Sequence, residues 1–392
     1  KNLKREIQVV VTCLSWDKEN DPDIIGLLAA SIALSISDIP WSGPIAGSRV
    51  GQLDGKLILN PIYGEREKGN LDLALAATFS PFAKALGNKD KDGILINMIE
   101  AEGNEIEEEV IAKAIQFAKP SLEKLIDFQK EIAKKVGKDK IALEANAEDD
   151  KELENDIRQF LGDKLEKTLF LKDKSERTGA VNSLKDDLIN FVEGKYPGPP
   201  AGGGKVQYAA GFLEKEIDEI IHKKIILEEK RPDGRKLNEI RELKAEVGLL
   251  PRTHGSGLFV RGQTQALSIL TLGAPDDVKL LEGMEFVGKK RFMHHYNFPP
   301  YSSGEIKPMR GPGRREIGHG MLAEKALLPL IPNFEEFPYT IRIVTEILSS
   351  NGSTSMAAVS AASLALMDAG VPIKEPATGI ALGLMQDNQG NY

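Results

Sequence analysis

An internal repeat limits the folds open to this chain more than any other feature. Residues 30–51 align without a gap with residues 362–383, at an offset of 332, and eight positions are identical. Both segments have a run of small residues with helical spacing, then two prolines, then two glycines. Two small-residue helices could match by chance, but chance does not explain the shared register of the prolines and glycines. We interpret the two regions as copies of one domain.

The residues between the copies have a different character. Residues 141–229 are rich in lysine, glutamate, aspartate and leucine, with apolar residues at helical spacing. This pattern predicts an all-α domain, although the glycine- and proline-rich stretch 196–204 cannot continue a helix. Strand-like and helix-like segments alternate on either side. The sequence thus predicts three domains, 1–140, 141–229 and 230–392, with an α/β (α+β) fold in the outer two.

The chain contains a different part of the domain in each of the two copies. About 120 residues precede the matched helix in the second copy, and only 22 precede it in the first. After Gly51 roughly 90 residues of the first copy follow, whereas nine residues follow Gly383. We therefore expect a fragment that is truncated within a domain at both ends.

Composition narrows the class of protein. Apolar residues are 41% and charged residues 28%, which is typical of a globular protein and excludes a disordered or fibrous chain. The longest uncharged apolar run, 24–37, is shorter than the ~18 residues that span a bilayer. No signal peptide is recognisable. The single cysteine, Cys13, forms no intrachain disulfide, so we expect a cytoplasmic protein without a membrane partner.

Charge is unevenly distributed along the chain. The net charge is −8, yet residues 231–320 alone carry +5. A basic zone on an acidic protein indicates local contact with a polyanion. A solvated charged surface is the simpler alternative.

A serine- and glycine-rich loop connects a predicted strand to the helix of the second copy. It reads SSNGSTS over residues 349–355. Gly352 lets the backbone approach a ligand, and the first-turn amides with the hydroxyls of Ser353 and Thr354 suit an anion. A plain N-cap is the alternative. The first copy has NDPD at 20–23, where a proline removes an amide and two carboxylates repel an anion.

Arginines gather in the glycine-rich segments of the second copy. Arg314 and Arg315 open a predicted helix, and His319 shares a face of that helix with Arg315. Guanidinium groups bind phosphate through paired hydrogen bonds, which predicts polyanion contact; surface ion pairs, with Glu316 as one partner, are the alternative. The same region contains Arg252 and Arg261.

Two adjacent histidines, His294 and His295, lie in a predicted strand and therefore point to opposite faces. No thiol or suitably spaced carboxylate accompanies them. We expect structural roles for both.

Periodicity predicts the regular elements. The predicted strands are 7–14, 56–62, 71–77, 93–99, 258–272, 285–297, 339–347 and 377–385, and the predicted helices outside the linker are 23–37, 105–119, 121–136, 315–330 and 353–369.

Together these segments resemble the polynucleotide phosphorylase family, the phosphate-dependent 3′→5′ exoribonucleases of bacteria and organelles. The likeness is specific over residues 230–383, which contain RPDGR, LPRTHGSGLFVRGQTQ, FMHHYNFPPY, RREIGHG and SNGSTSMAAVS. Residues 3–119 resemble the later part of the family's first core, with DPDI at 21–24 and SGPIAGSRVG at 42–51. Residues 141–229 resemble its helical linker only in position and character.

The resemblance implies two ribonuclease-PH-like cores, of the ribosomal protein S5 domain 2-like fold, joined by an all-α linker domain. It implies catalysis in the second core, and three identical chains in a ring around an RNA channel. The implied reaction is reversible: RNA(n+1) and phosphate give RNA(n) and a nucleoside diphosphate, in mRNA decay. The implied catalytic residues are His319, Ser353 and Thr354; the phosphate-binding residues are Gly352, Ser353, Thr354 and His319; the RNA-binding residues are Arg314, Arg315, Arg252 and Arg261.

Parts of the family pattern are absent from this sequence. The metal-binding aspartates, a catalytic lysine and the KH and OB-fold domains are expected beyond Tyr392, and the aromatic-arginine loop early in the first core is missing. The resemblance therefore implies Mg²⁺ or Mn²⁺ in the intact protein, no metal ligand in this chain, and a fragment inactive alone. Asp72 lies at the position in the first copy that a metal-binding aspartate would occupy in the second. Because it belongs to the first copy, we expect it to have a structural role. The implied partners are single-stranded RNA and RNA-degradation assembly proteins.

Two other functions stay open from the residues. A non-catalytic RNA-binding ring scaffold would keep the fold and lack the carboxylates. A small-molecule kinase is disfavoured because no complete GxxxxGK[ST] motif occurs.

Overall fold

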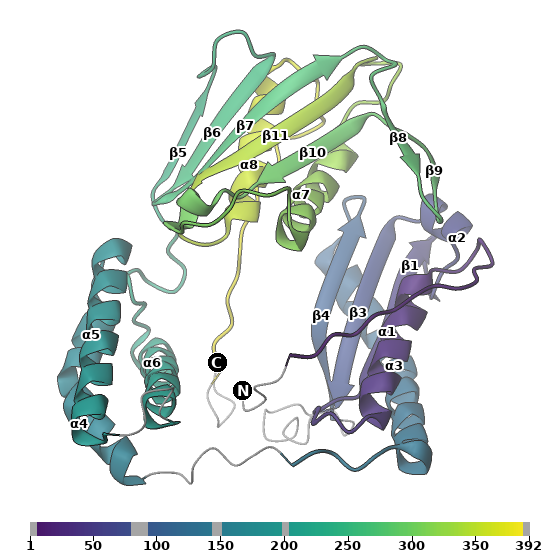
Figure 1. Ribbon diagram of the computed structural model, residues 1–392. Helices are drawn as coiled ribbons and strands as arrows, with labels where there is room; N and C mark the ends of the chain where they lie inside the picture. The colour runs from purple at the N-terminus through teal and green to yellow at the C-terminus, as the bar shows by residue number, and fades with distance from the viewer. Residues whose placement is uncertain (1–5, 80–92, 143–150, 198–203, 387–392) are drawn as a thin grey trace. The chain divides into compact units, whose positions relative to one another are not determined.

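The chain divides into two compact units. The computed structural model describes residues 6–79, 93–142, 151–197 and 204–386. Unit 1 is Lys1–Glu239 with Leu384–Tyr392, and unit 2 is Ile240–Gly383 (Figure 1). The predicted division into three domains stays a prediction.

Unit 1 contains a four-stranded antiparallel sheet in the order β2-β1-β3-β4. Helices α1 and α3 pack together on the sheet, so that leucines and alanines of β1 and β3 meet apolar residues of α3 in one core. The elements are α1 (Pro22–Ile36), β1 (Ile45–Leu53), β2 (Lys56–Leu59), α2 (Tyr63–Lys68), β3 (Leu71–Phe79), β4 (Ile94–Gly103) and α3 (Glu108–Val136).

Helix α3 corrects the prediction of two helices, 105–119 and 121–136. Pro120 lies inside one continuous helix. Proline removes one backbone hydrogen bond and usually bends or ends a helix. Here Ala114, Ala118, Leu122 and Ile126, all buried at a spacing of four, form one apolar face against the sheet. Burial of that face outweighs the lost hydrogen bond.

The middle of unit 1 is helical, as the sequence predicted. Helices α4 (Lys151–Leu169), α5 (Lys174–Lys195) and α6 (Gly204–Glu228) share a core of their own. Asp173 caps α5, since its carboxylate accepts hydrogen bonds from the amides of Ser175 and Glu176. Most of the loop predicted at 196–204 lies outside the described residues.

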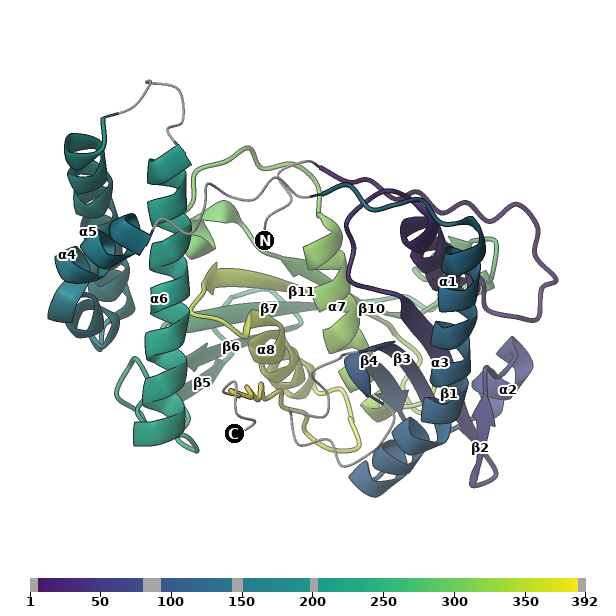
Figure 2. The ribbon, with the colours of Figure 1, turned by 90° about the horizontal axis from the view of Figure 1, so that it is seen from below.

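Unit 2 contains a five-stranded sheet in the order β10-β11-β7-β6-β5, in which only β10 and β11 run parallel. Helices α7 and α8 lie side by side on one face of it (Figure 2). The elements are β5 (Leu243–Val247), β6 (Gly255–Arg261), β7 (Thr264–Gly273), β8 (Lys279–Glu282), β9 (Val287–Lys290), β10 (Phe292–Asn297), α7 (Arg314–Leu327), β11 (Thr340–Ser349) and α8 (Thr354–Asp368), with short 3₁₀ helices at Pro300–Ser303 and Leu328–Leu330.

Glycines of the LPRTHGSG segment allow α8 to lie close to β6. A Cβ atom at Gly255 would stand 2.4 Å from the carbonyl oxygen of Ala365, and one at Gly257 would stand 2.5 Å from that of Ala361. No side chain fits at either position. This part of the motif therefore serves helix packing, and the packing sets where α8 begins.

The internal repeat is confirmed in three dimensions. Helices α1 and α8 have the same length, and the offset of 332 holds at both ends. The hydroxyl of Ser31 in α1 accepts a hydrogen bond from the amide of Ile45 (2.9 Å), and the hydroxyl of Ser363 in α8 accepts one from the amide of Ala377 (3.0 Å). The two copies thus share this bond between helix and following segment.

Several strand predictions are wrong. Residues 7–14 are exposed and pair with no described strand. Residues 258–272 form a hairpin, β6 and β7, that turns at Gly262 with φ of 58°. Residues 285–297 contain two strands, β9 and β10. Residues 377–385 form no strand; their amides at 377 and 379 bond to serine hydroxyls of α8 instead.

Candidate functional site

The loop between β11 and α8 has an unusual backbone. Gly352 and Ser353 both have positive φ, 81° and 51°, and Thr354 then begins the helix. Only glycine adopts this region without strain, so Ser353 is held there by its surroundings. A left-handed residue next to a right-handed one directs successive amides into one concavity, which is a common anion-binding arrangement.

Three side chains hold the loop through its carbonyl oxygens. Arg241 Nη1 donates to the carbonyl of Asn351 (2.8 Å). Arg261 Nη2 donates to the carbonyls of Gly352 (3.1 Å) and Ser353 (2.8 Å). The hydroxyl of Thr264 donates to the carbonyl of Gly352 (3.0 Å) and accepts from the amide of Asn351 (2.9 Å).

These bonds decide which way the loop amides face. In a trans peptide the carbonyl and the next amide point in opposite directions. The carbonyls of three consecutive residues, 351–353, are turned toward Arg241, Arg261 and Thr264. The amides of residues 352–354 therefore face away from these side chains. They add to the positive end of the α8 dipole, and the first turn of α8 has no acidic residue.

The two hydroxyls that follow Gly352 differ in their surroundings. Ser353 makes no side-chain cap bond, so the plain N-cap alternative is not what the structure shows. Thr354 is 2% exposed, and its Oγ1 lies 2.6 Å from the Oη of Tyr296 in β10. The hydroxyl of Thr354 is therefore turned into the unit, and that of Ser353 is left available.

Tyr296 also connects α8 to α7. Its ring is 5.2 Å from that of His319 in an edge-to-face arrangement. Burial raises the pKa of Tyr296 to about 12, so its hydroxyl stays protonated at neutral pH. Burial, followed by the nearby Arg315 charge, lowers the pKa of His319, and its Nδ1 has no hydrogen-bond partner within the described residues.

The two arginines at the start of α7 are exposed. Glu316 accepts a hydrogen bond from the amide of Gly313 (3.0 Å) and forms no ion pair with them in the described part of the chain. The guanidinium of Arg315 lies over the ring of Phe298, 4.6 Å from its centre. Arg314 and Arg315 thus present their charge at the surface, as contact with a polyanion requires.

Arg252 and Arg261, predicted together as RNA contacts, occupy different environments. Arg252 is exposed in the turn before β6. Arg261 directs its guanidinium to the loop carbonyls of Gly352 and Ser353. The structure thus brings Arg261 together with the loop between β11 and α8.

His294 is structural, as predicted. Its side chain is buried, with Nε2 2.9 Å from the hydroxyl of Thr345 and Nδ1 3.2 Å from the carbonyl of Gly320. Burial lowers its pKa to about 4. His295 points to the opposite, exposed face.

The first copy has a carboxylate where the second has the loop serine. Asp21 aligns with Ser353 and caps α1. Its side chain, 7% exposed, forms ion pairs with Arg49 (2.7 Å) and Arg66 (2.9 Å). Asp72 pairs with the same two arginines, at 2.6 Å and 2.7 Å. Asp72 therefore takes part in a structural network, as the sequence led us to expect.

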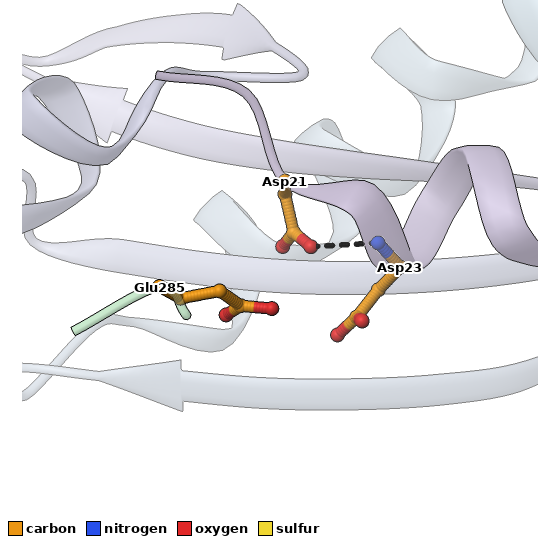
Figure 3. A group of neighbouring side chains, drawn as sticks. All are labelled: Asp21, Asp23 and Glu285. Atoms are coloured by element: carbon orange, nitrogen blue, oxygen red, sulfur yellow. Dashed lines mark hydrogen bonds between the residues drawn. The ribbon is translucent and has the colours of Figure 1, made fainter. Parts of the chain in front are cut away.

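The acidic side chains among the described residues form no metal centre within either unit. Figure 3 shows Asp21, whose carboxylate accepts the amide hydrogen bond of Asp23 (2.9 Å), together with Glu285. The aspartates belong to unit 1 and Glu285 to unit 2. The described residues of neither unit alone supply three clustered metal ligands.

Sequence reasoning missed Tyr296, Arg241 and Thr264. Tyr296 stood in the FMHHYNFPPY motif, two residues after a histidine predicted to alternate between faces. That alternation could have marked it as buried beside His294. No local pattern marked Arg241 or Thr264.

No helix among the described residues is both long and apolar enough to cross a membrane.

Both outer regions of the chain match a known family. Residues 239–372 match domain 1 of the 3′ exoribonuclease family, and residues 43–121 match domain 2. The domain 2 match lies inside unit 1, and the domain 1 match lies inside unit 2 except for its first residue, Glu239.

Curated relatives align with nearly the whole chain. A polyribonucleotide nucleotidyltransferase of Geobacillus kaustophilus is 47% identical over 99% of this chain and 51% of its own length. Those of Heliobacterium modesticaldum and Caldicellulosiruptor saccharolyticus are each 46% identical, over 99% and 100% of this chain and 52% and 53% of their own. The chain spans about half the length of the curated relatives it matches. Among solved structures, rice Rrp46 is 23% identical, with a TM-score of 0.28, over 37% of this chain and 65% of its own.

Proposed function

Because the chain belongs to the 3′ exoribonuclease family and aligns along its length with polyribonucleotide nucleotidyltransferases, we propose that the full-length protein is a phosphorolytic 3′→5′ exoribonuclease. An oxygen of inorganic phosphate attacks the phosphorus of the 3′-terminal phosphodiester. The bond from that phosphorus to the O3′ of the preceding nucleotide breaks. The products are a shortened RNA with a free 3′ hydroxyl and a nucleoside diphosphate, and the reverse reaction extends RNA.

One observation carries this proposal: the anchored loop at the start of α8. The reaction brings two anions together, so the protein must offset their repulsion. We assign the phosphate to the amides of residues 352–354 and the hydroxyl of Ser353. The amides face away from the cationic anchors, and the hydroxyl makes no cap bond. Thr354 contributes its amide, since its hydroxyl is bonded to Tyr296.

The remaining roles go to α7. Arg314 and Arg315 are exposed at its first turn and bind the RNA backbone. His319, one helical turn later, contacts the phosphate and, with its lowered pKa, is mostly neutral near pH 7. A neutral imidazole accepts a proton or donates one hydrogen bond, depending on its tautomer. Arg252, exposed before β6, adds a further RNA contact.

The metal ion expected for the family has no ligand set here. The described residues of unit 2 supply no cluster of carboxylate, histidine or cysteine ligands, so none of the roles above involves Mg²⁺ or Mn²⁺. We also propose single-stranded RNA as substrate, a ring of three identical chains, a role in mRNA decay with RNA-degradation assembly proteins, and a cytoplasmic location. These four proposals rest on the family of the relatives. No contact in this structure is used to support them.

Phosphate dependence tests the function. The full-length protein is incubated with a single-stranded RNA, with and without inorganic phosphate, and nucleoside diphosphate is measured. We expect nucleoside diphosphate only with phosphate. RNA binding without release of nucleoside diphosphate would instead support the non-catalytic scaffold.

A further inference from the structure

Tyr296 contacts residues of the proposed site on both α7 and α8. It is 3% exposed, near the end of β10. Its hydroxyl meets the hydroxyl of Thr354 at 2.6 Å, and its ring edge meets the ring of His319. Its ring also stacks on Phe298, 6.4 Å between centres, and Phe298 lies beneath Arg315.

These contacts join groups from two helices to one strand. Thr354 is the first residue of α8, while His319 and Arg315 lie on α7. Phosphate binding by the loop amides and by His319 requires a fixed distance between the helix starts, because a small displacement of a binding group greatly reduces its effect. The ring of Tyr296 near the end of β10 and the ring of Phe298 just after β10 supply that register.

We propose that Tyr296 is a positioning residue for phosphate: its hydroxyl fixes Thr354 and thereby the amides of residues 352–354, and its ring fixes His319 beside them. The inference rests on the proposed function and deepens it. Tyr296 does not itself exchange a proton with substrate, because it is buried and its hydroxyl is occupied by Thr354. Loss of the hydroxyl would leave the buried Thr354 Oγ1 without its partner and free the start of α8 to shift.

The ring and the hydroxyl can be separated experimentally. Tyr296→Phe keeps the ring against His319 and removes the hydroxyl, whereas Tyr296→Leu removes both. For the full-length protein we expect Tyr296→Phe to raise KM for phosphate about threefold to tenfold, with kcat and KM for RNA within about twofold of wild type. Tyr296→Leu should also lower kcat and shift its pH dependence, because His319 loses its neighbour.

A double-mutant cycle tests whether the effect runs through Thr354. Thr354→Val removes the same bond from the other side and should also raise KM for phosphate. In a Thr354→Val background, Tyr296→Phe should cause almost no further change, since the bond is already lost. Tyr301→Phe is the matched control, because Tyr301 is 57% exposed in the same segment and should behave as wild type.

The outcomes separate this inference from the function on which it rests. A wild-type protein that releases no nucleoside diphosphate overturns the proposed function. A wild-type protein that is active, with Tyr296→Phe unchanged in KM for phosphate or fully additive with Thr354→Val, overturns the role of Tyr296. Calorimetric titration with inorganic phosphate gives a readout without turnover: Tyr296→Phe should bind it more weakly than Tyr301→Phe, and equal affinities would also overturn the role.

Discussion

Arg261 donates a 2.8 Å hydrogen bond to the backbone carbonyl of Ser353, so a cation holds the loop at the point where its backbone is left-handed. The guanidinium therefore acts on the site through the orientation of neighbouring amides.

Arg261 and Arg252 should differ in what they affect. Arg261→Ala removes a charge-assisted bond to the loop, and we expect KM for phosphate to rise about tenfold or more. Arg252→Ala, at an exposed turn, should weaken RNA binding and leave KM for phosphate unchanged. Steady-state kinetics with phosphate varied at saturating RNA distinguishes the two. Arg261→Ala with wild-type KM for phosphate would contradict the anchoring role.

Arg314 and Arg315 should account for part of the salt dependence of RNA binding. Replacement of both by alanine removes two backbone contacts. The slope of log K against log salt should then become shallower by about 1.4 for single-stranded RNA. Lys134→Ala with Lys135→Ala, exposed at the end of α3, is the control of equal charge. Fluorescence anisotropy over a salt series gives the slopes, and a slope equal to wild type argues against RNA contact.

Ser353→Ala should separate binding from stability. The Ser353 hydroxyl makes no cap bond, so its removal should change the melting temperature by less than about 2 °C. KM for phosphate should rise several-fold if the hydroxyl contacts phosphate. With Thr354→Ala added, phosphate-dependent RNA decay at low phosphate should fall further, because the Tyr296–Thr354 bond is lost as well. Ser353→Gly, which relieves the positive φ, should melt slightly higher while losing phosphate affinity like the alanine variant. Unchanged release of nucleoside diphosphate by the double variant would refute this assignment.

His294 should make unit 2 less stable in mild acid. Burial lowers its pKa to about 4, below the usual 6.5. Between these values the unfolded chain binds a proton that the folded chain does not, so the free energy of unfolding falls as pH decreases, by about 1.4 kcal/mol per unit. Above pH 6.5 the contribution is complete. Denaturant unfolding of unit 2 between pH 7.5 and 5 tests this: His294→Gln should flatten the decline, whereas His222→Gln, in α6 of unit 1, should not affect the unfolding of unit 2.

Asp21 should contribute more to the free energy of unfolding of unit 1 than an ordinary surface carboxylate does. Asp21→Ala leaves two largely buried arginines with Asp72 alone, and we expect unit 1 to lose about 3 kcal/mol. Asp127→Ala removes an exposed pair with Lys130 and should cost less than about 1 kcal/mol. Chemical denaturation followed by circular dichroism measures both. Equal losses would mean that the Asp21 network is not stabilising.

Local patterns predicted the helices and the loop, and distant contacts explain the errors. The start of α8 could be predicted because a strand, a glycine and two hydroxyl residues follow each other directly. Tyr296 and Arg241 reach the loop from 58 and 110 residues away along the chain, as no spacing rule reveals. Strand formation has the same dependence on distant partners. Residues 7–14 have strand-like composition yet no described partner strand. Pro120 is itself exposed and is tolerated because the opposite face of α3 is buried against the sheet.

The carboxylate of Asp21 gives unit 1 a counter-ion that cannot diffuse away. It is covalently attached at the position that Ser353 occupies in the other copy, so its effective concentration beside Arg49 and Arg66 does not depend on the solution. At the phosphate site proposed above, unit 2 gains stability from bound phosphate, and this gain rises with the logarithm of free phosphate once its concentration exceeds Kd. When a cell is short of phosphate, the two copies should therefore respond differently: the first keeps its charges neutralised, and the second loses both its substrate and the stabilisation that the substrate provides.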